Sequence, residues 1–227
     1  MLLKQGQNEK GERARSDPTR PELVRSERVR SELIRKEDPR VIRTRQLLMQ
    51  GLMDLMQEKN FQAITIQDIA ERATVNRVTF YAHFSDKYAL LEYTIHKMIQ
   101  ERLRSQLPEG SPYSPENLAR LILTVCEFLT EMERQCPPPH GRLEPLMEKQ
   151  IKAELYDTLR DWLGERPVGG SRLRPTPEQA AMVASWAIYG AAVQWMQPGQ
   201  QYPAREYVQQ VLPLILGILQ PSAYGLE

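Results

Sequence analysis

Residues 65–87 decide the fold, and they read Thr-Ile-Gln-Asp-Ile-Ala-Glu-Arg-Ala-Thr-Val-Asn-Arg-Val-Thr-Phe-Tyr-Ala-His-Phe-Ser-Asp-Lys. Thr65 and Asn76 are good N-cap residues, so they predict two short helices, over 66–73 and from Asn76 to about residue 84. Thr74 and Val75 turn the chain between these helices. The residues that can form a small shared core are Ile69, Ala73, Val75, Phe80 and Phe84. Two short helices around a tight turn indicate a helix-turn-helix, whose second helix enters the major groove of DNA.

The outward face of the second helix carries side chains that can donate hydrogen bonds to phosphates or to base edges. They are Arg77, Thr79, Tyr81 and His83. Each has a structural alternative. Tyr81 could pack against the helix that precedes the motif, and His83 could make an internal hydrogen bond.

The segment closely resembles the DNA-binding domain of the TetR family of bacterial transcriptional regulators, over residues 40–95. The residues that carry the resemblance are Thr65, Asp68-Ile69-Ala70, Ala73, Val75, Thr79-Phe80-Tyr81, His83-Phe84, Lys87 and Leu90-Leu91. The resemblance implies a homodimer whose two recognition helices read a palindromic operator, most often as a repressor. It also implies a C-terminal domain that binds a small-molecule effector and forms the dimer.

The resemblance assigns a role to each position of the motif. Thr65 and Gln67, at the start of the first short helix, are implied phosphate contacts, and Arg77 and Val78 lie near the tip of the recognition helix. Arg77 is the best candidate for reading a base, because a guanidinium binds guanine bidentately. The remaining implied phosphate anchors are Thr79, Tyr81, His83 and Lys87. Lys87 could instead support the helix that it begins.

Three residues depart from the family pattern. Ala82 stands where larger groups often touch DNA, which shifts more of the expected reading onto Arg77 and Tyr81. Asn76 stands where Ser is common. It caps a helix equally well, and it is counted among the predicted DNA-binding residues. Thr74 stands at a turn position where Gly is common, and a β-branched residue is poorly suited to a positive φ. The geometry of the turn is therefore left open by the sequence.

The rest of the chain predicts helices and no strands. Further helices are expected over 39–58, from Ser85 or Asp86 to about 106, 115–134, 142–164, 177–197 and 203–219, and no region shows the alternation of a strand. The fold class is therefore all-α, with eight or nine helices. We expect a basic tail over 1–38, a three-helix DNA-binding domain over 39–86, and a helical effector-binding and dimerisation domain over 87–227.

The C-terminal half offers two sets of candidate residues. A pocket for a largely apolar effector would be lined by Cys126, Met132, Tyr156, Trp162, Trp186 and Tyr189. A dimer interface would use the small and apolar stripes Ala184, Ala187, Ala191, Val208, Val211, Leu212, Ile215 and Leu219. The alternative for both sets is ordinary core within one chain.

Charge divides the chain into a basic and an acidic half. Residues 1–104 carry 20 Lys and Arg against 15 Asp and Glu, whereas residues 105–227 carry 10 against 14, and the whole chain has a net charge of +1. Such asymmetry is a hint of nucleic-acid contact. The tail could be disordered, or it could be an arm that follows DNA phosphates or enters the minor groove.

Other classes of function have little support in the sequence. Cys136 and His140 supply only two of the ligands that zinc needs, and no phosphate-binding glycine loop or nucleophile elbow occurs. The uncharged stretch 180–196 is at the short limit for a membrane span, and a buried helix looks the same. We expect no cofactor, no metal, no membrane partner and no enzymatic activity, and a cytoplasmic location. The prediction is a homodimeric repressor, with an activator or a helical scaffold that does not bind DNA as the alternatives.

Overall fold

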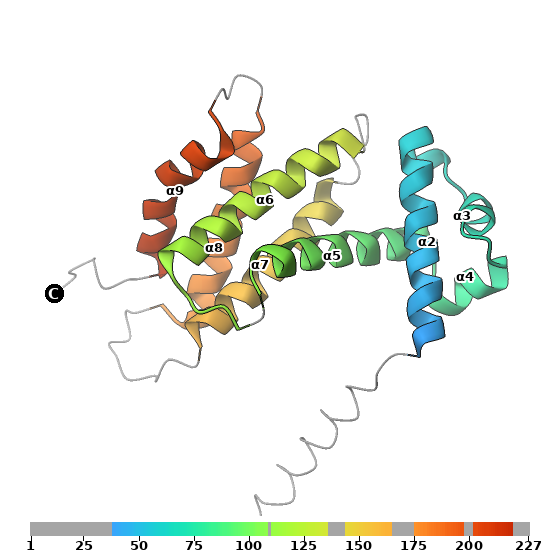
Figure 1. Ribbon diagram of the computed structural model, residues 1–227, viewed down its shortest axis with the longest axis horizontal. Helices are drawn as coiled ribbons and strands as arrows, with labels where there is room; N and C mark the ends of the chain where they lie inside the picture. Colours follow the sequence, from blue (N-terminus) through green and yellow to red (C-terminus); the bar gives the residue numbers. More distant parts are fainter. Residues whose placement is uncertain (1–37, 109, 136–143, 165–174, 198–201, 220–227) are drawn as a thin grey trace, which may run out of the picture. The chain divides into compact units, whose positions relative to one another are not determined.

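The computed structural model describes residues 38–108, 110–135, 144–164, 175–197 and 202–219. Across these residues the chain forms eight α-helices and one short 3-10 helix, with no strand (Figure 1). The predicted all-α class is therefore confirmed. Of the predicted tail, only Asp38 lies within the described residues, and Cys136 and His140 lie outside them.

The N-terminal helices begin where the sequence places their caps. Thr65, Asn76 and Asp86 each accept a hydrogen bond from a backbone N–H in the first turn that follows. The elements are α2 (Pro39–Glu58), η1 (Phe61–Ala63), α3 (Ile66–Arg72), α4 (Arg77–His83) and α5 (Lys87–Gln106). The 3-10 helix η1 was not expected from the sequence.

The C-terminal helices are α6 (Pro115–Gln135), α7 (Glu144–Leu163), α8 (Pro177–Trp195) and α9 (Ala204–Leu219). Helix α8 begins with a capping box, because Thr176 Oγ1 accepts from Gln179 N and Gln179 Oε1 accepts from Thr176 N. Of the helices in the described part of the chain, none combines the length and apolar character needed to cross a bilayer.

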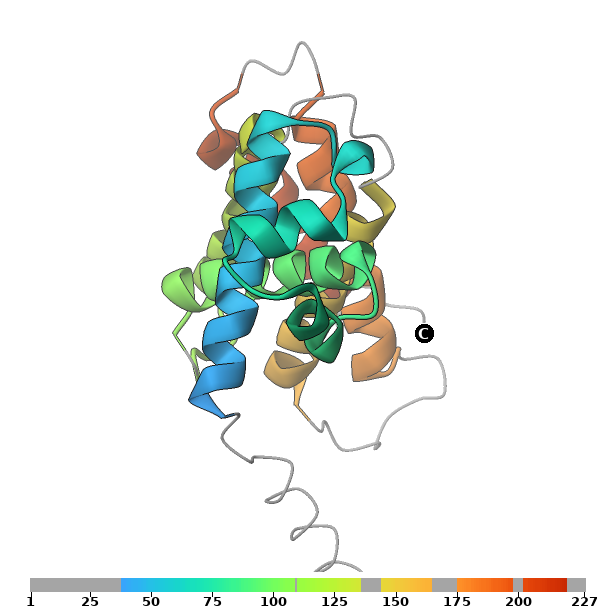
Figure 2. The same ribbon diagram turned by 90° about the vertical axis from the view of Figure 1, so that its right-hand side faces the viewer.

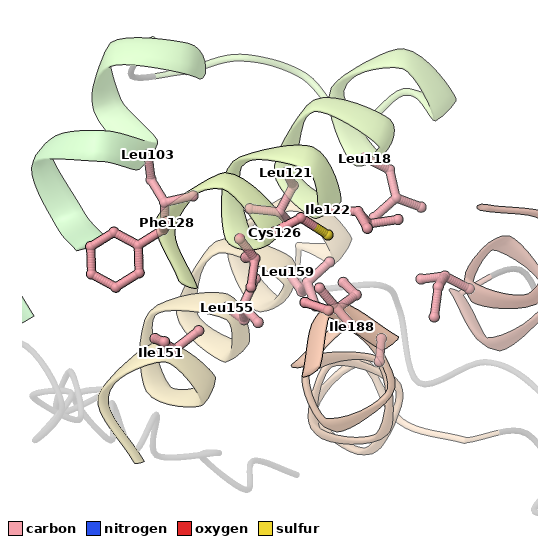
Figure 3. Close-up of a cluster of buried hydrophobic side chains, with 14 of the residues drawn as sticks. Leu103, Leu118, Leu121, Ile122, Cys126, Phe128, Ile151, Leu155, Leu159 and Ile188 are labelled. Atoms are coloured by element: carbon pink, nitrogen blue, oxygen red, sulfur yellow. The ribbon is translucent and has the colours of Figure 1, made fainter. Parts of the chain in front are cut away.

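Two apolar clusters hold the helices together, and α5 belongs to both. The first cluster joins α2, η1, α3, α4 and the first half of α5, which contributes Leu90, Leu91 and Ile95. The second joins α6 to α9 with the second half of α5, which contributes Ile99 and Leu103. The course of α5 can be followed in Figure 1. Figure 3 shows the second cluster, where Ile122 and Cys126 of α6 face α7 and α8.

Candidate nucleic-acid interface

A Schellman motif forms the turn between α3 and α4. Val75 N donates to Ala70 O at 2.9 Å, and Thr74 N donates to Glu71 O at 3.1 Å. Thr74 has a φ of 56°, in the left-handed region that such a turn requires. Glycine is the usual residue there, because a β-branched side chain is strained in that conformation. The chain therefore adopts the helix-turn-helix turn with strain at Thr74.

The first turn of α3 is held by a reciprocal cap that a third side chain reinforces. Thr65 Oγ1 accepts from Asp68 N at 3.1 Å, and Asp68 Oδ2 accepts from Thr65 N at 2.8 Å. Lys59, directly after α2, donates to the same oxygen of Asp68 at 2.8 Å. The hydrogen bond from Lys59, followed by those from Thr65, lowers the pKa of Asp68 to about 2. The start of α3 is thus tied to the end of α2.

Helix α4 presents one buried and one exposed face. Phe80 is fully buried in the first cluster, as the sequence predicted. Val78 is 75% exposed and Tyr81 is 48% exposed, and Arg77 is exposed beside them. In Figure 1 and Figure 2 the axes of α3 and α4 lie at a steep angle to each other. The outer side of α4 is therefore open to a partner.

Arg77 and Tyr81 lie one turn apart on α4 and contact each other. The guanidinium of Arg77 donates to Tyr81 Oη at 3.3 Å and lies 5.7 Å from the centre of its ring. The Tyr81 ring in turn packs edge-on against Phe80, with centroids 5.7 Å apart. This contact orders a long side chain on the face that would meet DNA.

The other predicted contact residues differ in accessibility. Gln67 is exposed and donates to Glu71 Oε1 at 2.6 Å, whereas Thr79 and His83 are half-buried. His83 lies near Phe84, with ring centroids 6.5 Å apart. Asn76 caps α4 by accepting from Val78 N at 2.8 Å. The contacts of these residues with DNA stay predictions.

Lys87 has a structural role that the resemblance did not imply. Its ammonium group donates to the backbone oxygens of Phe61, Gln62 and Ile64, at 2.9, 3.0 and 2.7 Å. These contacts favour the alternative stated above, that Lys87 supports the helix it begins. Its predicted role as a phosphate anchor stays untested.

Comparison with known proteins supports the same reading of this region. The sequence profile described as "Bacterial regulatory proteins, tetR family" matches residues 48–94. Two Bacillus subtilis proteins, both described as uncharacterised HTH-type transcriptional regulators, also match. YxbF is 37% identical over 98 residues, and YdeS is 30% identical over 95 residues. Each match covers 42% of this chain, and they cover 26% and 46% of the two relatives, respectively.

A solved structure has a similar fold over most of this chain. RolR, solved in complex with the ligand resorcinol, has a TM-score of 0.51 and 15% identity, and the match covers 83% of this chain and 97% of RolR. The fold and the motif thus define an all-helical protein with an N-terminal helix-turn-helix. The similarity to the TetR family of bacterial regulatory proteins lies in residues 48–94, and the two Bacillus subtilis relatives are described as HTH-type transcriptional regulators.

The six residues predicted to line an effector pocket do not line one common cavity. Cys126 and Met132 are buried in the second cluster, and burial raises the pKa of the Cys126 thiol to about 12. Trp162 donates to Ser111 O at 2.9 Å and packs against Tyr113. Tyr189 is half-buried, and its burial raises its pKa to about 12.

The other two predicted pocket residues, Tyr156 and Trp186, lie together in an open groove between α7 and α8. The groove has a volume of about 410 Å³. Trp186 is 62% exposed, and the ammonium of Lys152 lies 3.5 Å from the centre of its ring. The groove is lined by Pro145, Glu148, Lys149, Lys152, Ala153, Tyr156, Met182, Ser185 and Trp186. Sequence reasoning missed its basic residues, because α7 shows no motif.

Half of the residues predicted for the dimer interface are buried within one chain. Ala184, Val208, Ile215 and Leu219 belong to the second cluster. Tyr207 of α9 donates to Ala191 O at 3.0 Å, so the alanine stripe of α8 faces α9 of the same chain. Ala187, Val211 and Leu212 are partly buried against the same cluster. The exposed apolar residues of these helices are others, namely Met182, Val183, Trp186 and Leu214.

Proposed function

We propose that this protein is a sequence-specific DNA-binding transcriptional regulator. The observation that carries the proposal is the exposed face of α4, where Arg77 and the 75% exposed Val78 stand on a helix fixed from behind by Phe80. An exposed Arg–apolar pair suits the major groove, because Arg binds guanine and apolar groups contact the thymine methyl. The proposed phosphate contacts are Thr65, Gln67, Thr79, Tyr81 and His83.

The proposed acting species is a homodimer on a palindromic operator. Two copies are needed because one short helix reads only a few bases, and paired recognition helices read half-sites a helical turn or more apart. The outward faces of α8 and α9 support this, since Met182 and Val183 are each 49% exposed and Leu214 is 69% exposed. Exposed apolar side chains on these two helices are candidate contacts with a second copy, because contiguous apolar surface marks interaction sites.

The proposed control is repression relieved by a small, largely apolar ligand. The second cluster and the α7–α8 groove are the candidate sites, and RolR, with a similar fold, was solved with the small aromatic molecule resorcinol. Because α5 belongs to both clusters, a ligand that moves its second half would move α4 as well. Activation in place of repression uses the same geometry and is the second candidate.

The test is to select binding sites from a pool of random DNA duplexes with the full chain, and then to measure affinity by gel shift. The proposal expects an inverted repeat, and a selected duplex that binds more tightly than a scrambled one at moderate salt. A folded protein that enriches no sequence would contradict DNA reading and favour a scaffold role. A thermal-shift screen of small apolar compounds, followed by gel shift with each compound that stabilises the protein, tests the proposed relief of binding.

A further inference from the structure

All three N–H donors of the Lys87 ammonium group are hydrogen-bonded within the protein. A lysine ammonium has three N–H donors, and here three backbone oxygens accept them, from Phe61, Gln62 and Ile64. The separations of 2.7 to 3.0 Å are those of good hydrogen bonds. A phosphate oxygen could bind this group only by displacing one of these carbonyls.

Two aromatic rings lie beside the Lys87 ammonium group, and a further hydrogen bond joins α5 to η1. Lys87 Nζ lies 4.8 Å from the ring centre of Phe61 and 5.8 Å from that of Tyr88. Tyr88 Oη donates to Gln62 Oε1 at 3.1 Å, and its ring packs edge-on against Phe61. Burial lowers the pKa of Lys87, and the charge of Asp68 opposes that shift. We call Lys87 and Tyr88 with Phe61, Gln62 and Ile64 the α5–η1 joint.

The joint ends directly at the cap of α3. Ile64, whose carbonyl accepts the shortest of the three hydrogen bonds at 2.7 Å, precedes the N-cap residue Thr65. Ile64 N also donates to Phe61 O at 3.2 Å, so the joint defines the whole turn between α2 and α3. The first turn of α5 therefore fixes the place of Thr65 and, through it, of α3.

We propose that Lys87 is a positioning residue, which holds the start of α3 against the first turn of α5, and that it is not a phosphate ligand. The part that concerns DNA rests on the proposed function, whereas the part that concerns the joint does not. Through this joint, a displacement of α5 reaches Thr65 and α3 directly as well as α4.

The first experiment acetylates the lysines of the full chain and reads each site by peptide mass spectrometry, without DNA and with a random-sequence duplex. Lys149, whose side chain is 65% exposed, is the reactive reference. We expect Lys87 to react much more slowly than Lys149 in the free protein, and DNA to leave its rate unchanged. A rate equal to that of Lys149 without DNA, or protection that appears only with DNA, would overturn the proposal.

The second experiment measures the salt dependence of DNA affinity for Lys87→Met. Loss of a phosphate contact would reduce the slope of log K against log salt by about 1. We expect an unchanged slope and an affinity lower by about tenfold, the size expected when one charge-assisted hydrogen bond to DNA is displaced. A slope reduced by about 1 would overturn the proposal.

Two further variants keep this second experiment decisive. Lys97→Met removes the same charge farther along α5, and we expect it to change neither slope nor affinity. Tyr88→Phe removes only the hydroxyl bond to Gln62, so it tests the joint even if Lys87→Met fails to fold. It should lower affinity severalfold with an unchanged slope, and an unchanged affinity would count against the joint. If the wild-type chain binds no DNA, the proposed function fails, and acetylation of the free protein still decides the joint.

Discussion

A Cβ atom on Gly51 would stand 3.2 Å from the backbone nitrogen of Ala73 and 3.4 Å from its Cβ. Helix α2 therefore meets the end of α3 almost backbone to backbone. Ala73 N donates to Ile69 O at 2.9 Å, and Ala73 is followed by the strained Thr74. The neighbour that Gly51 contacts is thus held in place and cannot easily move away.

We predict that Gly51→Ala destabilises the protein by about 1 kcal/mol. A methyl group forced into a packed contact costs about 1–3 kcal/mol, and the better helix propensity of Ala returns about 1. Denaturant unfolding measures the difference. Gln50→Ala, at the exposed neighbouring position, is the control and should stay within about 0.5 kcal/mol of wild type. A stabilised Gly51→Ala variant would mean that α3 moves away freely.

Replacing Thr74 by Gly should stabilise the protein by up to about 1 kcal/mol. The left-handed conformation costs an L-residue about 1–2 kcal/mol, and the greater freedom of Gly in the unfolded chain cancels about 0.5–1 of the gain. The same denaturant experiment applies. Thr74→Ala keeps a Cβ atom, so it should gain less than Thr74→Gly. A Thr74→Gly variant less stable than wild type would show that the threonine is not strained.

Acid should weaken the capping of α3. The folded-state pKa of Asp68 is about 2, below its ordinary value of 3.8, so its stabilising effect is present above about pH 4 and is lost as the pH falls toward 2. Melting temperatures across this range should fall less steeply for Asp68→Asn, which keeps an oxygen for Thr65 N but does not ionise. Glu101→Gln, at an exposed position on α5, should follow the wild-type curve. Parallel wild-type and Asp68→Asn curves would contradict the prediction.

Arg77→Ala should reduce discrimination between DNA sequences. The loss of a bidentate base contact costs about 1–3 kcal/mol on the selected duplex, whereas binding to a random duplex should change little. Tyr81→Phe keeps the ring and removes the hydroxyl that accepts from Arg77, so it should cause a smaller loss in the same direction. Gel-shift titrations on both duplexes measure this. Equal losses on the two duplexes would show that Arg77 contacts only phosphate.

Val183→Arg should convert the proposed dimer to a monomer. Val183 is 49% exposed on α8, and a charge buried against a second copy would be unpaired. Sedimentation equilibrium gives the mass, and circular dichroism checks that the helices remain. Glu127→Arg, at an exposed position on α6, should leave the mass unchanged. A dimeric Val183→Arg protein would place the interface elsewhere.

The sequence predicted the local structure well, because caps and breakers act over a few residues. Thr65, Asn76 and Asp86 begin their helices where expected, and Phe80 and Phe84 are buried as the helical spacing indicates. The positive φ of Thr74 could be suspected from its place in the motif. Only the backbone hydrogen bonds of the turn could establish it.

The sequence did not predict contacts between side chains and distant backbone. The carbonyls that bind Lys87 lie 23 to 26 residues earlier and belong to a 3-10 helix and its C-cap residue, Ile64, and this helix has no sequence signal of its own. The small-residue stripe of α8 was equally ambiguous. Its spacing describes a close helix neighbour, and it does not say whether that neighbour is α9 of the same chain or a second copy.

Helix α5 limits where the chain can be divided into separately folding fragments. Leu90, Leu91 and Ile95 complete the apolar cluster of the helix-turn-helix, so a fragment that stops at residue 86 would expose Phe80, Phe84 and the buried face of α2. A fragment extended beyond residue 95 keeps that cluster whole, but it cuts a continuous helix whose next turns supply Ile99 and Leu103 to the other cluster. Both apolar clusters contain part of the same continuous helix, α5, so heating should unfold them in a single cooperative transition.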